Sequence, residues 1–347
     1  MVGRGCFVDV NGRVEPSLDR SEGLPQRIPL TKRDILVGLM VTLATFSAVL
    51  LVPLAGIGAG LFVPLPTLLS IYRFGHPAGF WIPGGVLALG LPLLYSLGAL
   101  GDVPYLLAML LVGVLLGEGM RRQWSVEKTI GIAVGAALIV GTVAFGLAGG
   151  GFSPQFWASL EEEMRHNVAA VLQTYHDVGL GFDQQAVLDA IPKTIPVFIR
   201  LLPGATLVSL LLIGWLNVLV ASRFCRVRRL PLPPWPPWAH WKAPEPLVWV
   251  VIAAGGMLLL PSRAIMLVGC NLLLGVSTVY LLQGLAIAVF YLHRWNVPRM
   301  LRAIVFALLL VQPLATFLMM LLGLFDMWFN FRRLPPTGVQ PDVSETS

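Results

Sequence analysis

The feature that most constrains this chain is a series of long apolar stretches, which recur from Ile35 to Phe331 with short connections between them. A helix needs about 20 consecutive apolar residues to cross a hydrocarbon core about 30 Å thick. Charged residues make up only 12% of the chain, against about 25% in soluble domains. Because neither alternating barrel strands nor their turn spacing occurs, we predict an all-α, polytopic transmembrane helix bundle with about eight or nine spans.

The alternation of apolar and polar stretches predicts five segments. A polar cytoplasmic N-terminal segment, residues 1–33, precedes a membrane core at 34–222. A basic, Pro/Trp-rich cytoplasmic linker occupies 223–246. A C-terminal transmembrane hairpin with a last span follows at 247–331, and a polar tail occupies 332–347.

Basic residues border the predicted spans in a pattern that indicates orientation. The polar N-terminal segment is rich in Lys and Arg, and four later connections carry further basic residues: Arg73; Arg121, Arg122 and Lys128; Arg223, Arg226, Arg228 and Arg229; Arg294, Arg299 and Arg302. The positive-inside rule then predicts a multi-pass protein of the bacterial inner (plasma) membrane with a cytoplasmic N-terminus. This rule also accounts for the net charge of +6, so no nucleic-acid partner is expected.

One basic pair disagrees with this orientation. With nine full crossings, Arg332 and Arg333 would lie outside. Either one short segment does not cross the membrane, or the pair is tolerated on the outer side.

Two segments between the predicted spans have a composition that differs from that of the spans: one is amphipathic and the other is proline-rich. Residues 153–190 place apolar side chains near one face of a helix, which predicts an amphipathic extracytoplasmic helix. The proline-rich linker predicts a polyproline II segment with three residues per turn. That spacing puts Trp235, Trp238 and Trp241 on one edge, where we expect them to anchor the linker at the membrane interface. A PxxP ligand for a partner domain is the alternative.

The motifs of common enzymes and metal sites are absent from the sequence. It contains neither a phosphate-binding G-x-x-x-x-G-K-[ST] loop nor an H-E-x-x-H pair, and its five histidines never occur at ligand spacing. Paired carboxylates and a Ser/His set are also lacking. We therefore expect no catalytic residue, no metal and no cofactor, and an intramembrane enzyme is the least favoured class.

Polar residues inside the spans are the candidate ligand-binding groups, because each is costly in lipid. Glu118 either faces a buried site or pairs with the arginines beside it, and Arg200 either meets an anionic ligand or reaches head groups. Asn271 and Gln283 either line a site or bond helix to helix.

Prolines mark a second candidate region for ligand binding. The stretch GIGAGLFVPLP at 56–66, which contains Pro64 and Pro66, predicts a broken helix. Such a break is tolerated only where the freed backbone groups line a cavity or contact protein. A tight connection between two short helices is the alternative.

Two stretches near the C-terminus, YLLQGLAI at 280–287 and FDMWFNFRR at 325–333, resemble the YybS-like family of uncharacterised bacterial membrane proteins, described as a domain of unknown function. The resemblance extends over residues 30–335. That family is remotely similar to S components of energy-coupling-factor transporters and to MreD-type cell-shape proteins. The S-component resemblance implies a six-helix substrate-binding core whose first helix meets a coupling subunit through an Ala-x-x-x-Ala pair, a position that Ala44 and Ala48 fit.

Two functions follow as hypotheses. The first is a non-enzymatic membrane subunit that binds or helps move a small molecule, with a cavity near 56–66 and residues 153–190 as a lid. The alternative is a structural or assembly scaffold of the cell envelope. The expected partners are the lipid bilayer and a further membrane subunit or coupling ATPase complex. A cavity lined by Glu118, Arg200, Asn271 or Gln283 would favour binding, whereas tight packing there would favour the scaffold.

Overall fold

The computed structural model describes residues 7–8, 14–15, 31–51, 58–148, 153–177 and 184–333. Two short strands, β1 (Phe7–Val8) and β2 (Val14–Glu15), pair in antiparallel fashion. The other regular elements are helices: α1 (Lys32–Leu51), α3 (Pro64–Phe74), η2 (Ala78–Phe80), α4 (Trp81–Ser96), η3 (Leu100–Asp102), α5 (Val103–Arg121), α6 (Val126–Ala148), α7 (Pro154–Asp177), α8 (Gln184–Val227), η4 (Trp238–His240), α9 (Leu247–Leu258), α10 (Arg263–Arg294), α11 (Arg299–Val311) and α12 (Pro313–Phe329). The chain is therefore the helical protein that the apolar stretches predict.

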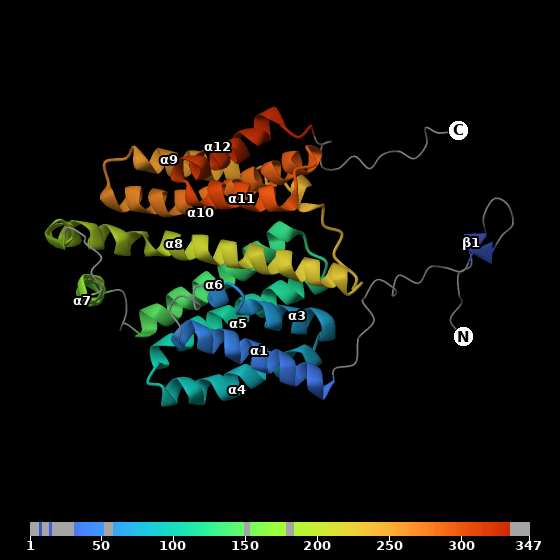
Figure 1. The fold of residues 1–347 in the computed structure, drawn as a ribbon, viewed down its shortest axis with the longest axis horizontal. Helices are drawn as coiled ribbons and strands as arrows, with labels where there is room; N and C mark the ends of the chain where they lie inside the picture. Colours follow the sequence, from blue (N-terminus) through green and yellow to red (C-terminus); the bar gives the residue numbers. More distant parts are fainter. Residues whose placement is uncertain are drawn as a thin grey trace.

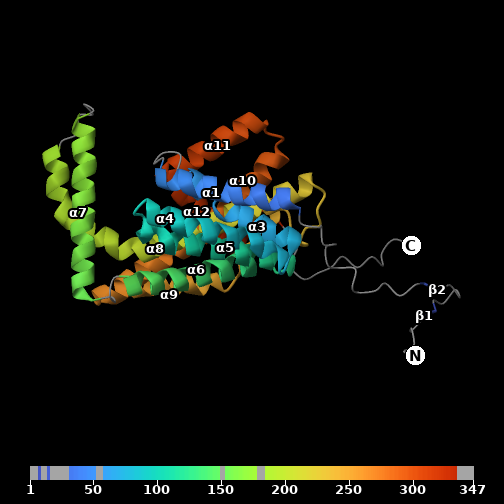
Figure 2. The ribbon, with the colours of Figure 1, turned by 90° about the horizontal axis from the view of Figure 1, so that it is seen from below.

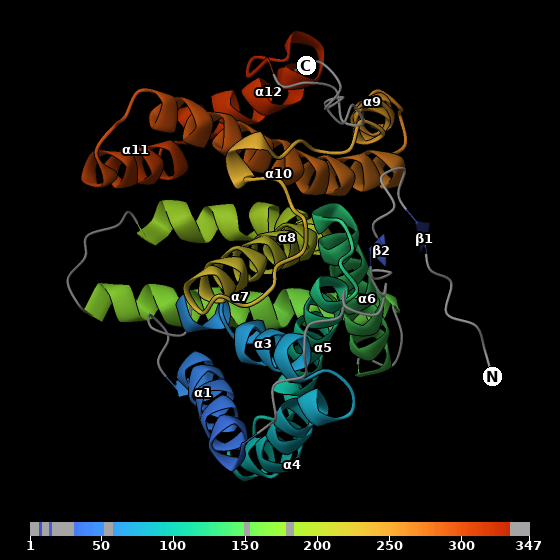
Figure 3. The same cartoon turned by 90° about the vertical axis from the view of Figure 1, so that its right-hand side faces the viewer.

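Helix α8 lies between two groups of helices (Figure 1). Helices α1, α3, α4, α5 and α6 form one group, and α9 to α12 form the other (Figure 3). Helix α7 stands across the direction of the others at one end of the bundle (Figure 2). The predicted amphipathic segment 153–190 falls in two elements: its first part forms α7, whereas residues 184–190 belong to the start of α8.

Five helical segments are each long and apolar enough to cross a membrane, namely Ala78–Ser96, Leu100–Arg121, Val126–Leu147, Thr194–Val227 and Arg263–Arg294. Helices α11 and α12 form a further pair that is bent by 98° at its break, which gives six if the pair counts as one span. Helix α9 is apolar but shorter. Five or six candidate spans thus occur in the described part of the chain, and the count of eight or nine stays a prediction.

The ends of α3, α5, α8 and α10, which carry or border the predicted cytoplasmic basic residues, lie at one end of the bundle, where the linker also lies (Figure 1). Arg73 at the end of α3 lies 4.0 Å from Asp34 at the start of α1. Arg226 from α8 and Arg294 from α10 line one cavity. We call this common location the basic end. That this end faces the cytoplasm stays a prediction from the positive-inside rule.

Both ends of the α11–α12 pair also lie at the basic end. Helix α11 begins five residues after Arg294. After α12, the Phe331 carbonyl accepts a hydrogen bond from the hydroxyl of Tyr291 at 2.9 Å. We therefore expect the pair to form a re-entrant hairpin rather than one broken span. A re-entrant hairpin would place Arg332 and Arg333 on the same side as the other basic residues.

Sided labelling tests this topology. In a cysteine-free background, single cysteines at Asn296 and Arg333 should react with an impermeant maleimide from the same membrane face, because both flank the hairpin. A cysteine at Ser262, which precedes the opposite end of α10, should react from the other face. Labelling of Asn296 and Arg333 from opposite faces would show instead that the pair crosses the membrane.

Candidate functional site

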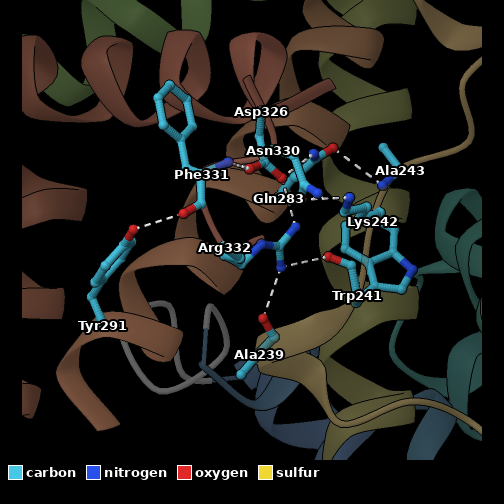
Figure 4. Close-up of polar contacts among 10 residues, drawn as sticks. All are labelled: Ala239, Trp241, Lys242, Ala243, Gln283, Tyr291, Asp326, Asn330, Phe331 and Arg332. Atoms are coloured by element: carbon cyan, nitrogen blue, oxygen red, sulfur yellow. Dashed lines mark hydrogen bonds and ion pairs between the residues drawn. The ribbon is translucent and has the colours of Figure 1, made fainter. Parts of the chain in front are cut away.

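A buried ion pair lies where α12 ends near the linker (Figure 4). Nη2 of Arg332 lies 2.8 Å from Oδ2 of Asp326, and both side chains are 0% exposed. Charges so completely removed from water are costly unless other hydrogen bonds satisfy them as well. The surroundings of this pair supply most of those bonds.

The Asp326 carboxylate accepts two further hydrogen bonds, one from α10 and one from the turn after α12. Gln283 donates from Nε2 to Oδ2 at 3.1 Å, and the Phe331 amide donates to Oδ1 at 2.9 Å. On the other side, Nη1 of Arg332 donates to the carbonyls of Ala239 at 2.8 Å and Trp241 at 2.9 Å. The pair therefore joins α10, α12 and the linker.

The linker is held along residues 239–243 by two further contacts. The Ala243 amide donates to Oε1 of Gln283 at 3.1 Å, and Nζ of Lys242 donates to Oδ1 of Asn330 at 3.0 Å. Asn330 ends α12 with φ 39°, in the left-handed region that asparagine tolerates. This turn directs Arg332 back toward the linker, as Figure 4 shows.

A cavity of about 490 Å³ lies beside this polar network. Its lining residues are Lys242, Ala243, Glu245, Pro246, Val248, Trp249, Gln283, Met327 and Trp328. Two of them are large and exposed aromatic side chains, Trp249 at 70% and Trp328 at 60%. The cavity thus combines an ammonium, a carboxylate and an amide with an apolar wall.

Of the predicted ligand-binding residues, Gln283 is the one that this cavity contains. Glu118 lies elsewhere, at the basic end of α5. Its carboxylate accepts hydrogen bonds from Nε of Arg121 at 2.9 Å and Nε of Arg122 at 2.5 Å, and lies 3.0 Å from Nε2 of His76. Glu118 is 7% exposed. This geometry matches the ion-pair alternative for that residue.

Asn271 bridges two backbone groups one helical turn apart in α8. Its Nδ2 donates to the Arg200 carbonyl at 3.0 Å, and its Oδ1 accepts from the Gly204 amide at 2.5 Å. These are the groups that bond each other in a regular α-helix, so the α10 side chain inserts into the α8 hydrogen-bond ladder. Asn271 thus makes the helix-to-helix contact that the sequence left as its alternative, at a place separate from Gln283 and Glu118. The contact uses only the backbone of Arg200, whose side chain is exposed.

The predicted broken helix at 56–66 is described from residue 58 onward. Pro64 begins α3 and is followed by Pro66 within its first turn. The Leu61 carbonyl before the break accepts a hydrogen bond from Nδ2 of the buried Asn217 in α8 at 2.7 Å. The freed backbone group is thus satisfied by a neighbouring helix, as expected for a tight connection.

The three linker tryptophans contact protein, and the burial of Trp241 differs from the anchoring role expected of it, whereas Trp235 and Trp238 are partly exposed and their anchoring role stays a prediction. Trp241 is 6% exposed and donates from Nε1 to Oε1 of Glu127 at 2.6 Å. Trp235 donates to the Trp124 carbonyl at 2.7 Å, and Trp238 packs against Trp215 with ring centroids 5.7 Å apart. The buried Trp241 ring cannot sit among head groups, so it fastens the linker to the start of α6.

Ala44 is exposed and Ala48 is partly exposed on α1. Phe46, between them in the sequence, is fully buried. The alanine pair thus lies on the side of α1 that the described helices leave open, and its role as a partner interface stays a prediction.

Helix α7 covers another cavity, of about 320 Å³, with Trp157 and Leu160. Residues of α6 and α8, among them Phe145 and Leu202, complete this cavity. The cavity that α7 lines thus lies at α6 and α8 rather than at residues 58–66, and the lid role predicted for residues 153–190 stays a prediction.

Sequence reasoning did not single out Asp326, Arg332 or Lys242 as site residues. A signal was present, because the two stretches that carry the family resemblance contain Gln283 and the Asp326–Arg332 pair, respectively. The structure brings these two stretches into direct contact.

Apolar helices able to span a bilayer, with a basic end and a buried polar network, define an integral membrane protein. The family described as "Predicted membrane protein (DUF2232)" matches residues 40–327, and the chain belongs to this family. It is also similar to the "Uncharacterized protein YybS" of Bacillus subtilis (strain 168), with 22% identity over 292 residues that cover 82% of this chain and 91% of that protein. No solved structure matches the chain. The likeness to S components and MreD-type proteins stays a prediction.

Proposed function

We propose that this chain is a non-enzymatic subunit of the bacterial inner membrane that binds a small amphiphilic molecule between α9, α10 and α12. The observation that carries the proposal is the cavity of about 490 Å³ beside Gln283. Cavities of about 300–1,000 Å³ with apolar walls and a few fixed polar groups are the usual sites of small ligands. Here the fixed polar group is Gln283, whose amide is oriented by both Ala243 and Asp326.

The distribution of groups in the cavity supports an amphiphile. Lys242 and Glu245 offer charges to a polar head, while Trp249, Met327 and Trp328 offer an apolar surface to a chain or ring. Tryptophan favours the boundary between lipid and water, where a molecule of this type also resides. Neither a nucleophile with an adjacent base nor a carboxylate pair lines the cavity, so the proposal includes no reaction.

The test is ligand retention by the full-length protein in mild detergent. Native mass spectrometry should detect a bound small molecule, and polar lipid extract or amphiphilic metabolites should raise the midpoint of thermal unfolding. Trp249→Ala and Trp328→Ala should abolish both effects, since they remove the apolar wall. Trp295→Ala is the matched control, because this exposed tryptophan lies outside the cavity lining.

A scaffold of the cell envelope is the second candidate function. The hydrogen bonds of Glu118 and Asn271 to neighbouring groups of the same chain favour it, as does the open side of α1 at Ala44 and Ala48. Absence of both ligand and thermal stabilisation, together with a membrane partner that co-purifies at a fixed ratio, would exclude the binding function and support the scaffold.

A further inference from the structure

A third cavity, of about 630 Å³, lies at the basic end of the bundle, and Gln283 is not among its lining residues. It lies where the end of α8, the short helix η4 and the end of α10 meet. Its lining residues are Arg226, Pro237, Trp238, Ala239, His240, Val289, Phe290, His293 and Arg294. Three segments that are distant in the sequence therefore contribute to one concave surface.

The cavity gathers basic side chains without an opposing carboxylate among its described lining residues. Arg226 and Arg294 come from different helices, and His240 and His293 add two imidazoles. All four side chains are exposed. At the end of α5, by contrast, the two arginines Arg121 and Arg122 are both paired with the carboxylate of Glu118.

The wall of this cavity is fixed by packing and hydrogen bonds. The His240 ring packs against Phe290 with centroids 5.6 Å apart, and Nδ1 of His293 lies 2.8 Å from the Val289 carbonyl oxygen. The Ala239 carbonyl is held by the buried Arg332 at 2.8 Å. The cavity is thus a formed pocket with basic groups on its rim, which distinguishes it from a run of solvated arginines on a helix surface.

We propose that this cavity binds a phosphate group, carried either by an anionic lipid or by a soluble phosphate compound. Guanidinium groups stay charged at every physiological pH and match two phosphate oxygens at once. Two guanidinium groups from separate helices allow the anion to be held from two sides. The proposal concerns a different cavity from the one beside Gln283, and it does not depend on the proposed function.

The test uses the full-length protein in nanodiscs and two probes. Binding of inorganic phosphate is measured by calorimetry in nanodiscs of phosphatidylcholine alone. Bound phosphatidylglycerol is counted by native mass spectrometry after nanodiscs are prepared with added phosphatidylglycerol. Binding of the first probe identifies a soluble source of the phosphate group, and binding of the second alone identifies a lipid source.

The double variant Arg226→Gln/Arg294→Gln should weaken whichever binding is found by at least about 30-fold, since it removes the charge-assisted hydrogen bonds of both guanidinium groups to the phosphate oxygens. The variant Arg226→Lys/Arg294→Lys keeps the charge and should retain an intermediate affinity. Arg223→Gln/Arg228→Gln removes equal charge from the same region but outside the cavity lining, and it should change affinity by less than about threefold. The proposal is overturned if the wild type binds neither probe, or if the two glutamine variants lose affinity equally.

Discussion

Replacing Arg332 with methionine should lower the free energy of unfolding by about 3–5 kcal/mol, because the change leaves a buried carboxylate without its counter-ion. The Asp326 and Arg332 side chains are both 0% exposed and 2.8 Å apart, so water cannot replace the lost guanidinium. The loss also frees the Ala239 and Trp241 carbonyls, which Arg332 holds in the folded protein. Unfolding by denaturing detergent in mixed micelles measures the difference.

Two further variants give this prediction its control. Arg333→Gln alters the next arginine, which is exposed, and should change the free energy of unfolding by less than about 0.5 kcal/mol. The double variant Asp326→Leu/Arg332→Met removes both charges. Its loss of unfolding free energy should therefore be smaller than the sum of the losses in the two single variants. An Arg332→Met protein as stable as Arg333→Gln would mean that the ion pair is not buried in the membrane-embedded protein.

The ion pair matters beyond stability because the linker segment that it holds contributes residues to the lining of both cavities. Ala239 belongs to the lining of the basic cavity, whereas Lys242 and Ala243 belong to that of the cavity beside Gln283. Arg332 and Gln283 fix this segment through the carbonyls of Ala239 and Trp241 and the amide of Ala243. Displacement of the segment would therefore alter both cavities together.

The helices were predictable from the sequence because an apolar stretch has few alternatives in lipid. For the polar residues, the sequence supplied pairs of alternatives but not the contacts that each side chain makes. Glu118 bonds Arg121 and Arg122, which are near it in sequence, whereas Asn271 bonds a helix 71 residues away. Single sequences carry no direct information on such distant pairings.

The buried ion pair was beyond prediction for a related reason. Asp326 and Arg332 are six residues apart, and only the left-handed turn at Asn330 brings them together inside the protein. The spacing of the linker tryptophans likewise predicts a common edge, yet it does not say what that edge faces. Trp241 bonds Glu127 of α6, 114 residues away, whereas Trp238 packs against Trp215 of α8.

Helices α10 and α12 cross closely at Gly284 and Gly323, and we expect a side chain at this crossing to lower the stability of the protein strongly. A Cβ atom on Gly284 would overlap the Met319 carbonyl, and one on Gly323 would overlap the Tyr280 carbonyl. Both obstacles are backbone atoms of packed helices, so a side chain cannot be accommodated by a rotamer change. Gly284→Ala should lower the free energy of unfolding by about 3 kcal/mol or more, which is the upper range for overpacking a core.

The Gly284→Ala substitution should also disturb the cavity beside Gln283. Gln283 is adjacent to Gly284 and bonds Asp326 across the same crossing of α10 and α12. Separation of α12 from α10 would break that bond and open the cavity beside it. We therefore expect Gly284→Ala to lose both detergent resistance and any bound molecule. Gly255→Ala on α9 is the matched control, because a Cβ atom there meets nothing within 4 Å and alanine favours helix. Equal stability of the two variants would show that α10 and α12 cross at a greater distance than their glycines allow.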